Sequence, residues 1–112
     1  MAQIKSLGII TIASGGTPVP IWDPATKDPH YKVTKIRIVP LRGNAGDIFI
    51  GIGASFNKST GVGVIDHITK EPTTGAGDRF LIESHDVNTL FPATIYIDGT
   101  TNDGAVVSVV EA

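Results

Sequence analysis

Apolar and polar residues alternate most regularly over residues 33–52, in the stretch VTKIRIVPLRGNAGDIFIGI. In its first part Ile36 and Ile38 face one way, whereas Lys35 and Arg37 face the other. A period of two residues is typical of a strand with one buried face, because successive side chains of a strand point to opposite sides. The pattern therefore predicts a half-buried strand here.

The second part of this stretch alternates as well, with Ile48, Ile50 and Ile52 on one face. Between the two parts lie residues 42–46, RGNAG. Glycine and asparagine tolerate the positive φ angles of hairpin loops. We therefore predict that residues 33–52 form a β-hairpin and that the other segments pack around it.

Six further apolar runs predict strands, each bounded by glycine, proline or polar turn residues. Gly8 lies inside the first run and indicates a bulge or a bend. Two prolines near the second run remove donors from a strand ladder, which favours a short edge strand. Residues 85–91 have room for one helical turn, capped by Asp86 or Asn88. The six runs are residues 4–14, 19–22, 62–68, 79–84, 94–98 and 105–110.

Eight strands, with turns at close to the roughly 8–12-residue spacing of all-β proteins, predict the fold class. We expect one domain over residues 1–112, an all-β antiparallel β-sandwich whose two sheets hide their apolar faces from water. We also expect tight turns between most successive strands. The side chains expected in the core are Ile36, Ile38, Ile48, Ile50, Phe80, Ile82, Ile95, Ile97 and Val109.

The composition agrees with an all-β fold and limits the kinds of partner that the protein is expected to bind. The 112 residues include 13 glycines and no cysteine, which excludes a disulfide framework and a thiolate metal site. The formal net charge is −2 and the nine lysines and arginines are scattered, so we expect no nucleic-acid partner, which would need a basic stripe. No apolar run approaches the roughly 18 residues of a membrane span, and the N-terminus lacks a signal-peptide pattern. We therefore expect no membrane partner and a mature chain that begins at Met1.

Candidate catalytic chemistry is sparse in the sequence. There is no Gly-x-Ser-x-Gly elbow, and in the loop at residues 53–60 Lys58 stands where a phosphate-binding loop needs a glycine. Glu83 and His85 lie two positions apart, but a zinc site needs three or four convergent ligands. A cupin-like metal enzyme stays the weakest alternative, and a triad assembled only in three dimensions stays open. We predict that the protein is not an enzyme, with no catalytic or metal-binding residues and no cofactor.

Apolar residues near both ends of the chain indicate contacts with other proteins. The last strand carries valines on both faces, which a monomeric edge strand would avoid. Trp22, the lone tryptophan, lies beside a proline-rich edge and is either an interface anchor or a plug over one end of the sandwich. Residues 1–7 are expected to form an arm that adds to the contact. The predicted protein-interaction residues are Ile4, Leu7, Trp22, Val107 and Val109.

Three stretches together resemble a known family. They are TIASGGTPVPI at residues 11–21, KIRIVPLRGNAGDIFIGIG at residues 35–53 and TIYIDGTTNDGAVVSVV at residues 94–110. In this order they are similar to the small all-β head decoration, or cement, proteins of tailed bacteriophages. The resemblance implies a β-sandwich or jelly-roll-like fold without catalytic residues, in a virion protein made in the host cytoplasm and bound to the capsid exterior. Residues 70–78 depart from the family as a long insertion.

Two functions follow as expectations. The first is a structural virion protein that decorates and stabilises a bacteriophage capsid by bridging neighbouring subunits of the major capsid protein. Its self-association is expected to give a homotrimer in preference to a homodimer. The alternative is a ligand- or carbohydrate-binding β-sandwich module, such as part of a phage fibre.

Overall fold

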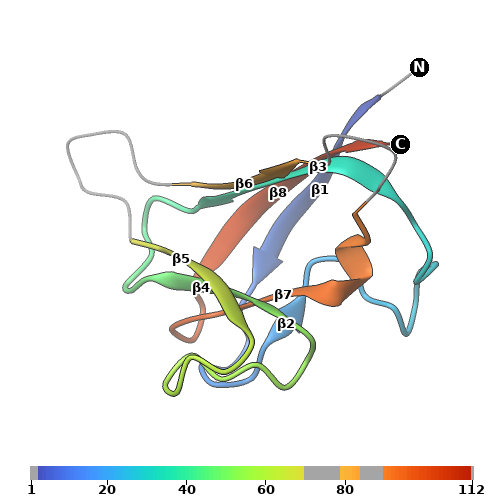
Figure 1. Ribbon diagram of the computed structural model, residues 1–112. Coiled ribbons are helices and arrows are strands. Elements are labelled where there is room, and N and C mark those ends of the chain that lie inside the picture. The colour runs from blue at the N-terminus through green and yellow to red at the C-terminus, as the bar shows by residue number, and fades with distance from the viewer. Residues whose placement is uncertain (1–2, 70–78, 84–89, 112) are drawn as a thin grey trace.

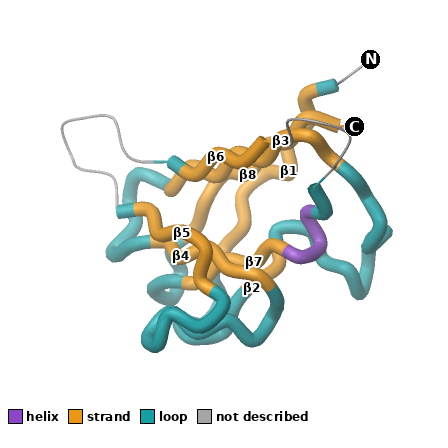
Figure 2. Tube along the Cα trace, in the orientation of Figure 1, coloured by secondary structure: helices purple, strands orange, loops and turns teal. Residues whose placement is uncertain are grey.

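The computed structural model describes residues 3–69, 79–83 and 90–111 of the chain. These residues form eight strands and one turn of 3-10 helix, η1 (Pro92–Thr94), which precedes the seventh strand (Figure 2). The strands are β1 (Ile4–Thr11), β2 (Val19–Pro20), β3 (Val33–Pro40), β4 (Ile48–Ile52), β5 (Val64–Ile68), β6 (Phe80–Glu83), β7 (Ile95–Asp98) and β8 (Gly104–Glu111).

The eight strands form two four-stranded sheets that lie as two layers (Figure 1). One sheet has the order β1-β8-β3-β6 and the other has the order β2-β7-β4-β5. Every pairing between these strands is antiparallel. The prediction of an all-β antiparallel fold of about eight strands is confirmed, and the arrangement is sandwich-like.

The core lies between the layers and is filled by aliphatic side chains from both sheets. The alternation along β3 positions it, because Ile36 and Ile38 are fully buried whereas Arg37 between them is exposed. Eight of the nine predicted core side chains are buried, and the ninth, Ile82, packs against them while partly exposed. Deeply buried residues outside that prediction include Ile12, Ile21, Val33, Ile68 and Val107.

Residues 33–52 do not form the predicted hairpin. β3 pairs with β8 and β6, whereas β4 pairs with β7 and β5 in the other sheet. The chain therefore crosses from one layer to the other between β3 and β4. Among the described strands only β4 and β5 are both consecutive and paired, so the prediction of tight turns between most successive strands is also wrong.

The loop that makes this crossing is hydrogen-bonded to residues at the start of β8. The Asn44 side-chain amide donates to the Gly104 carbonyl at 2.8 Å, and the Gly104 N–H donates back to the Asn44 side-chain oxygen at 3.0 Å. The buried Asp103 carboxylate accepts the backbone N–H groups of Ala45 and Gly46 at 2.8 and 2.9 Å. The loop that the sequence predicted to be a hairpin turn therefore connects the two layers and is held by hydrogen bonds to Asp103 and Gly104.

The predicted irregularity at Gly8 is present in β1. The register with β8 shifts between Ser6 and Gly8, and Gly8 has a φ angle of +82°. Glycine adopts this conformation without the steric cost that a side chain would bring, and a shift of this kind is a β-bulge. The two-residue strand β2 lies at the edge of its sheet, as its prolines predicted.

Some predictions fall on residues that the structure does not describe. The insertion at residues 70–78 lies wholly outside the described residues. The predicted helical turn at residues 85–91 lies mostly outside them, together with both of its candidate caps and His85.

Candidate functional site

The large apolar side chains that stay exposed fall mainly into two groups in the part of the chain that the structure describes. One group lies on the face of the β1-β8-β3-β6 sheet that is turned away from the core, here called the outer face. The other group lines a pocket between the sheets. The first group is Ile4, Ile9, Leu81 and Val106, and the second is Ile52, Ile65 and Phe91.

Strand register aligns the side chains of the outer face in rows across the sheet. Ile9 of β1 pairs with Val106 of β8, which pairs with Val39 of β3. In this aliphatic row Ile9 is 60% exposed and Val106 is 39% exposed. Near the start of β1, Ile4 is 79% exposed and pairs with Val110. The outer face therefore presents apolar surface on a regular scaffold.

Two cations project from β3 between these apolar positions. The Lys35 ammonium lies 3.7 Å from a carboxylate oxygen of Glu83 on β6. Arg37, which is opposite Ser108 of β8, forms no ion pair within residues 3–69, 79–83 and 90–111. A shallow depression of about 220 Å³ lies beside Lys35, Arg37 and Ile4. The outer face thus combines aliphatic rows with the positive charges of Lys35 and Arg37.

The pocket between the sheets has a volume of about 340 Å³. Ile36 and Phe80 line it from one sheet, and Ile52, Ile65 and Ile95 line it from the other. Residues of β5 and β6, which are neighbouring edge strands of the two sheets, form part of its lining. Its wall is therefore a lateral extension of the hydrophobic core.

Apolar groups lie at the rim of this pocket, and one ammonium group lies close to one of them. Ile65 is 44% exposed there, and Phe91 is also partly exposed. The Lys32 ammonium lies 6.0 Å from the centroid of the Phe91 ring. The Thr94 hydroxyl, on the pocket wall, donates to the Phe91 carbonyl at 2.8 Å, so its proton is already used within the chain.

Trp22 belongs to a compact cluster of aromatic and cationic side chains. Its ring stacks on Tyr31 with the centroids 4.2 Å apart, and its indole N–H donates to the Asp28 carbonyl at 2.7 Å. The Lys27 and Lys5 ammonium groups lie 4.7 and 5.6 Å from the centroid of the same ring. Trp22 therefore has aromatic, cationic and hydrogen-bonding partners within the chain.

Tyr31 links this cluster to the end of β8. Its hydroxyl donates to the Glu111 carboxylate at 2.8 Å. Burial raises the pKa of Tyr31, and the hydrogen bond and negative charge of Glu111 raise it further, to about 12. All three effects penalise the tyrosinate form.

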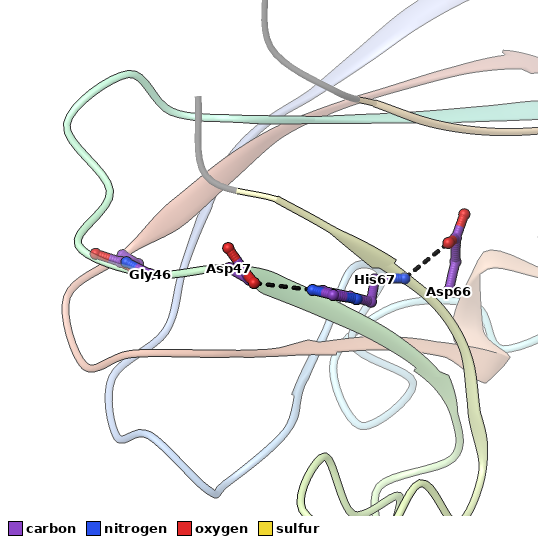
Figure 3. A network of polar contacts seen from close by, with 5 residues as sticks. Gly46, Asp47, Asp66 and His67 are labelled. Carbon is purple, nitrogen blue, oxygen red and sulfur yellow. Dashed lines mark hydrogen bonds and ion pairs between the residues drawn. The ribbon is translucent and has the colours of Figure 1, made fainter. Parts of the chain in front are cut away.

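A polar network joins Asp47, directly before β4, to the edge strand β5 (Figure 3). The His67 Nε2 atom lies 2.8 Å from Asp47 Oδ2, and the His67 backbone N–H donates to the Asp66 carboxylate at 2.7 Å. The imidazole also stacks on its cross-strand partner Phe49, with the centroids 4.8 Å apart. Asp47 could not be identified from the sequence as the partner of His67, because only the pairing of β4 with β5 brings the two residues together.

The structure places two of the predicted interaction residues in the core. Val107 and Val109 are 0% and 2% exposed and point between the sheets, so neither can touch a partner while the sheets stay packed. The exposed valine of this strand is Val106, which the prediction left out. Ile4 lies on the outer face, and Leu7 is partly buried against the core.

Residues considered for catalysis have structural partners. Lys58 donates to the Gly99 carbonyl at 2.5 Å, and Glu83 is paired with Lys35. Within the described ranges, no three or more histidine and acidic side chains gather as a group that could hold a metal ion. The same residues include no helix of the length and apolarity needed to cross a bilayer.

No protein-family model, curated protein or solved structure matches the chain. The resemblance to phage decoration proteins, and the functions expected from it, therefore stay predictions.

Proposed function

We propose that the protein is a structural virion protein that decorates a bacteriophage capsid and stabilises it by bridging neighbouring subunits of the major capsid protein. The observation that carries this proposal is the outer face, where Ile4, Ile9 and Val106 expose apolar surface on one regular sheet. Apolar surface gathered on one face of a soluble domain is typical of a protein–protein contact. Burying it removes apolar area from water, which stabilises a complex by about 25 cal/mol per Å².

Arg37 gives this surface its chemical selectivity. Arginine is enriched among the residues that dominate interface energetics. Arg37 is exposed in the middle of β3, next to the aliphatic row, and has no ion-pair partner within the described ranges. The complementary surface on the capsid is therefore expected to be apolar, with a carboxylate placed opposite Arg37.

The proposal includes a jelly-roll fold for the domain. In an eight-stranded jelly roll the chain passes repeatedly between two sheets, and the first strand lies beside the last. The orders β1-β8-β3-β6 and β2-β7-β4-β5 support this interpretation. Viral capsid domains and lectins both use jelly rolls, so the fold supports a virion role by analogy alone and the outer face provides the specific argument.

Self-association is part of the same proposal, as a homotrimer in preference to a homodimer. Several linked copies strengthen weak individual contacts by effective concentration. The predicted arm is a poor target for testing this, because its residues 4–7 belong to β1 and pair with β8. Truncation there would disturb the sheet, so point substitutions on the outer face are the better tool.

The test is sedimentation of the protein, alone and with capsids of the encoding phage prepared without it. Ile9→Asp places a carboxylate in the aliphatic row, and Val62→Asp is the matched control because Val62 is also exposed but lies outside the outer face. We expect the wild type and Val62→Asp to sediment with capsids and Ile9→Asp to lose at least tenfold in affinity. A wild type that never sediments with capsids would overturn the capsid role. Binding of Ile9→Asp with the affinity of the wild type would show that the contact with the capsid lies elsewhere than on the outer face.

A further inference from the structure

We propose that the apolar pocket between the two sheets binds an anionic amphiphile with a single alkyl chain, of the size of decanoate. The alkyl chain lies between the sheets and the carboxylate lies at Lys32. This site is on the side of β5 and β6, away from the outer face, so the inference goes beyond the proposed capsid role and does not depend on it.

The size of the pocket selects a small ligand. Its volume of about 340 Å³ falls in the range of roughly 300–1,000 Å³ that is usual for ligand sites. An apolar cavity of about 150 Å³ is enough for benzene, so this pocket has room for a longer chain or a larger ring. A hydrocarbon chain of medium length fits that space.

The lining of the pocket selects a hydrocarbon. Ile36, Phe80 and Ile95 form its inner wall and are buried members of the core. Thr94 is the lone lining residue with a polar side chain among those described, and its hydroxyl proton is held by the Phe91 carbonyl. A polar ligand group in the interior would lose its hydrogen bonds to water without replacement, which disfavours binding. An alkyl chain carries no such penalty.

The rim of the pocket gives a reason for binding. Ile52 and Ile65 are 48% and 44% exposed, although isoleucine is among the residue types that are most often fully buried. They lie on β4 and β5 and meet Phe91 at the same pocket. A bound chain would cover all three side chains at once, and each methylene removed from water would strengthen binding.

The positive charge of Lys32 selects the head group. The Lys32 side chain is exposed, and its ammonium lies 6.0 Å from the centroid of the Phe91 ring, which lines the pocket. An ammonium attracts a carboxylate or phosphate and repels a quaternary amine. An alkyl chain inserted past Phe91 would therefore hold an anionic head beside Lys32.

The first experiment compares three probes with the same ten-carbon chain by calorimetry and NMR: decanoate, decanol and decyltrimethylammonium, all below micelle formation. We expect one decanoate per chain, with decanol two- to fivefold weaker and the ammonium compound weaker still, since an exposed ion pair contributes about 0.2–1 kcal/mol. Amide and methyl shifts should map to the pocket lining. Equal binding of all three probes would overturn the role of Lys32, and no binding of any would overturn the site.

The second experiment uses matched variants of the full chain. Lys32→Gln should weaken decanoate two- to fivefold and leave decanol unchanged, whereas Lys27→Gln, which also removes an ammonium that stands over an aromatic ring, should change neither. Ile65→Asp puts a carboxylate at the pocket rim and should weaken decanoate binding at least tenfold, whereas Val62→Asp should leave it unchanged. If Ile65→Asp fails to fold, Ile52→Asp on the neighbouring strand takes its place. Unchanged decanoate binding by a folded Ile65→Asp or Ile52→Asp variant would overturn the proposal.

A final experiment separates a free carboxylate from a membrane lipid, because both offer an alkyl chain with an anionic head. The protein is floated with vesicles of phosphatidylcholine alone and of phosphatidylcholine with phosphatidylglycerol. Decanoate binding without flotation would assign the site to a free amphiphile, as proposed. Flotation with the anionic vesicles that Ile65→Asp abolishes would overturn the free ligand in favour of a lipid surface.

Discussion

Ile50 and Ile52 are the same residue type, two positions apart on β4, but their surroundings differ. Ile50 is 0% exposed in the middle of the core, whereas Ile52 lies at the pocket rim. Ile50 pairs with Ile97 and Ile52 pairs with Ile95, both buried residues of β7, so the two side chains lie on one face of the sheet, as the alternating pattern predicted. Ile52 is more exposed because it is the last residue of β4 and lies at the pocket rim.

Ile50→Ala is expected to destabilise the protein by about 2–5 kcal/mol, because it leaves a cavity in a core that cannot fully collapse. Ile52→Ala, at a partly exposed position, should cost much less, about 1 kcal/mol or under. Urea unfolding of the two variants measures both values. Equal losses would contradict the burial difference between the two positions.

Tyr31 is expected to make stability fall at high pH. Its pKa is raised from an ordinary 10.0 to about 12, mainly by burial and then by Glu111. A raised pKa contributes stability that is fully present below the unfolded pKa near 10 and is lost as the pH rises through about 12. The stability advantage of the wild type over Tyr31→Phe should therefore shrink between pH 10 and 12.

Urea unfolding of both proteins across this pH range checks the expectation, since lysine ionisation is common to the two. The tyrosinate absorbance gives a second readout, because Glu111→Gln removes the hydrogen-bonding carboxylate and should lower the pH at which Tyr31 ionises. A stability difference between wild type and Tyr31→Phe that stays constant from pH 10 to 12 would contradict the shift.

Most core residues could be predicted from alternation, but contacts made by loops could not. Phe56 lies in a segment interpreted as a polar connection, yet it is only 4% exposed. A Cβ atom added to Gly51 would come within 2.3 Å of the Phe56 ring, so this glycine leaves the space that the ring fills. The sequence around Phe56 has no period that indicates burial, because its contact comes from a chain reversal.

At the scale of elements, the alternating runs predicted the existence of the strands and missed their partners. The valines of β8 illustrate the reason. This strand is central in its sheet and pairs with β1 and β3, so its inner valines fill the core and Val106 shows on the outer face. The sequence indicates that both faces are apolar, but which face is inside depends on a register fixed by distant strands.

The crossing between β3 and β4 shows why the hairpin prediction was wrong. A glycine- and asparagine-rich loop meets the backbone requirements of a hairpin and of other tight connections equally well. What decides the outcome is the acceptor for its backbone N–H groups, and that acceptor is Asp103, nearly 60 residues later. No local pattern contains this information.

Asp103→Ala is expected to destabilise the protein by about 1–3 kcal/mol or more, because two backbone N–H groups would lose a largely buried acceptor. Amide hydrogen exchange at Ala45 and Gly46 should accelerate in this variant. Asp66→Ala is the control, since this exposed carboxylate accepts the backbone N–H of its neighbour His67, and its cost should stay within about 0.5 kcal/mol. Equal effects of the two substitutions would contradict an anchoring role for Asp103.

At the scale of the whole molecule, the strand order joins distant parts of the chain. The register pairs Ile4 with Val110, so the first and last strands lie side by side. Among the described strands, only β4 and β5 are sequence neighbours that pair. Nearly every strand pairing therefore requires the closure of a long loop. The chain loses conformational entropy on this closure before the contacts between the strands stabilise it.

Refolding is consequently expected to take milliseconds to seconds, the range of β proteins dominated by distant contacts. Stopped-flow dilution from urea measures it, with the lone tryptophan, Trp22, which stacks on Tyr31 in the folded chain, as the fluorescence probe. Rates that do not change with protein concentration would assign the slow step to folding within one chain and not to assembly. Complete refolding within microseconds would contradict the order of the strands, because it would mean that local contacts guide the chain.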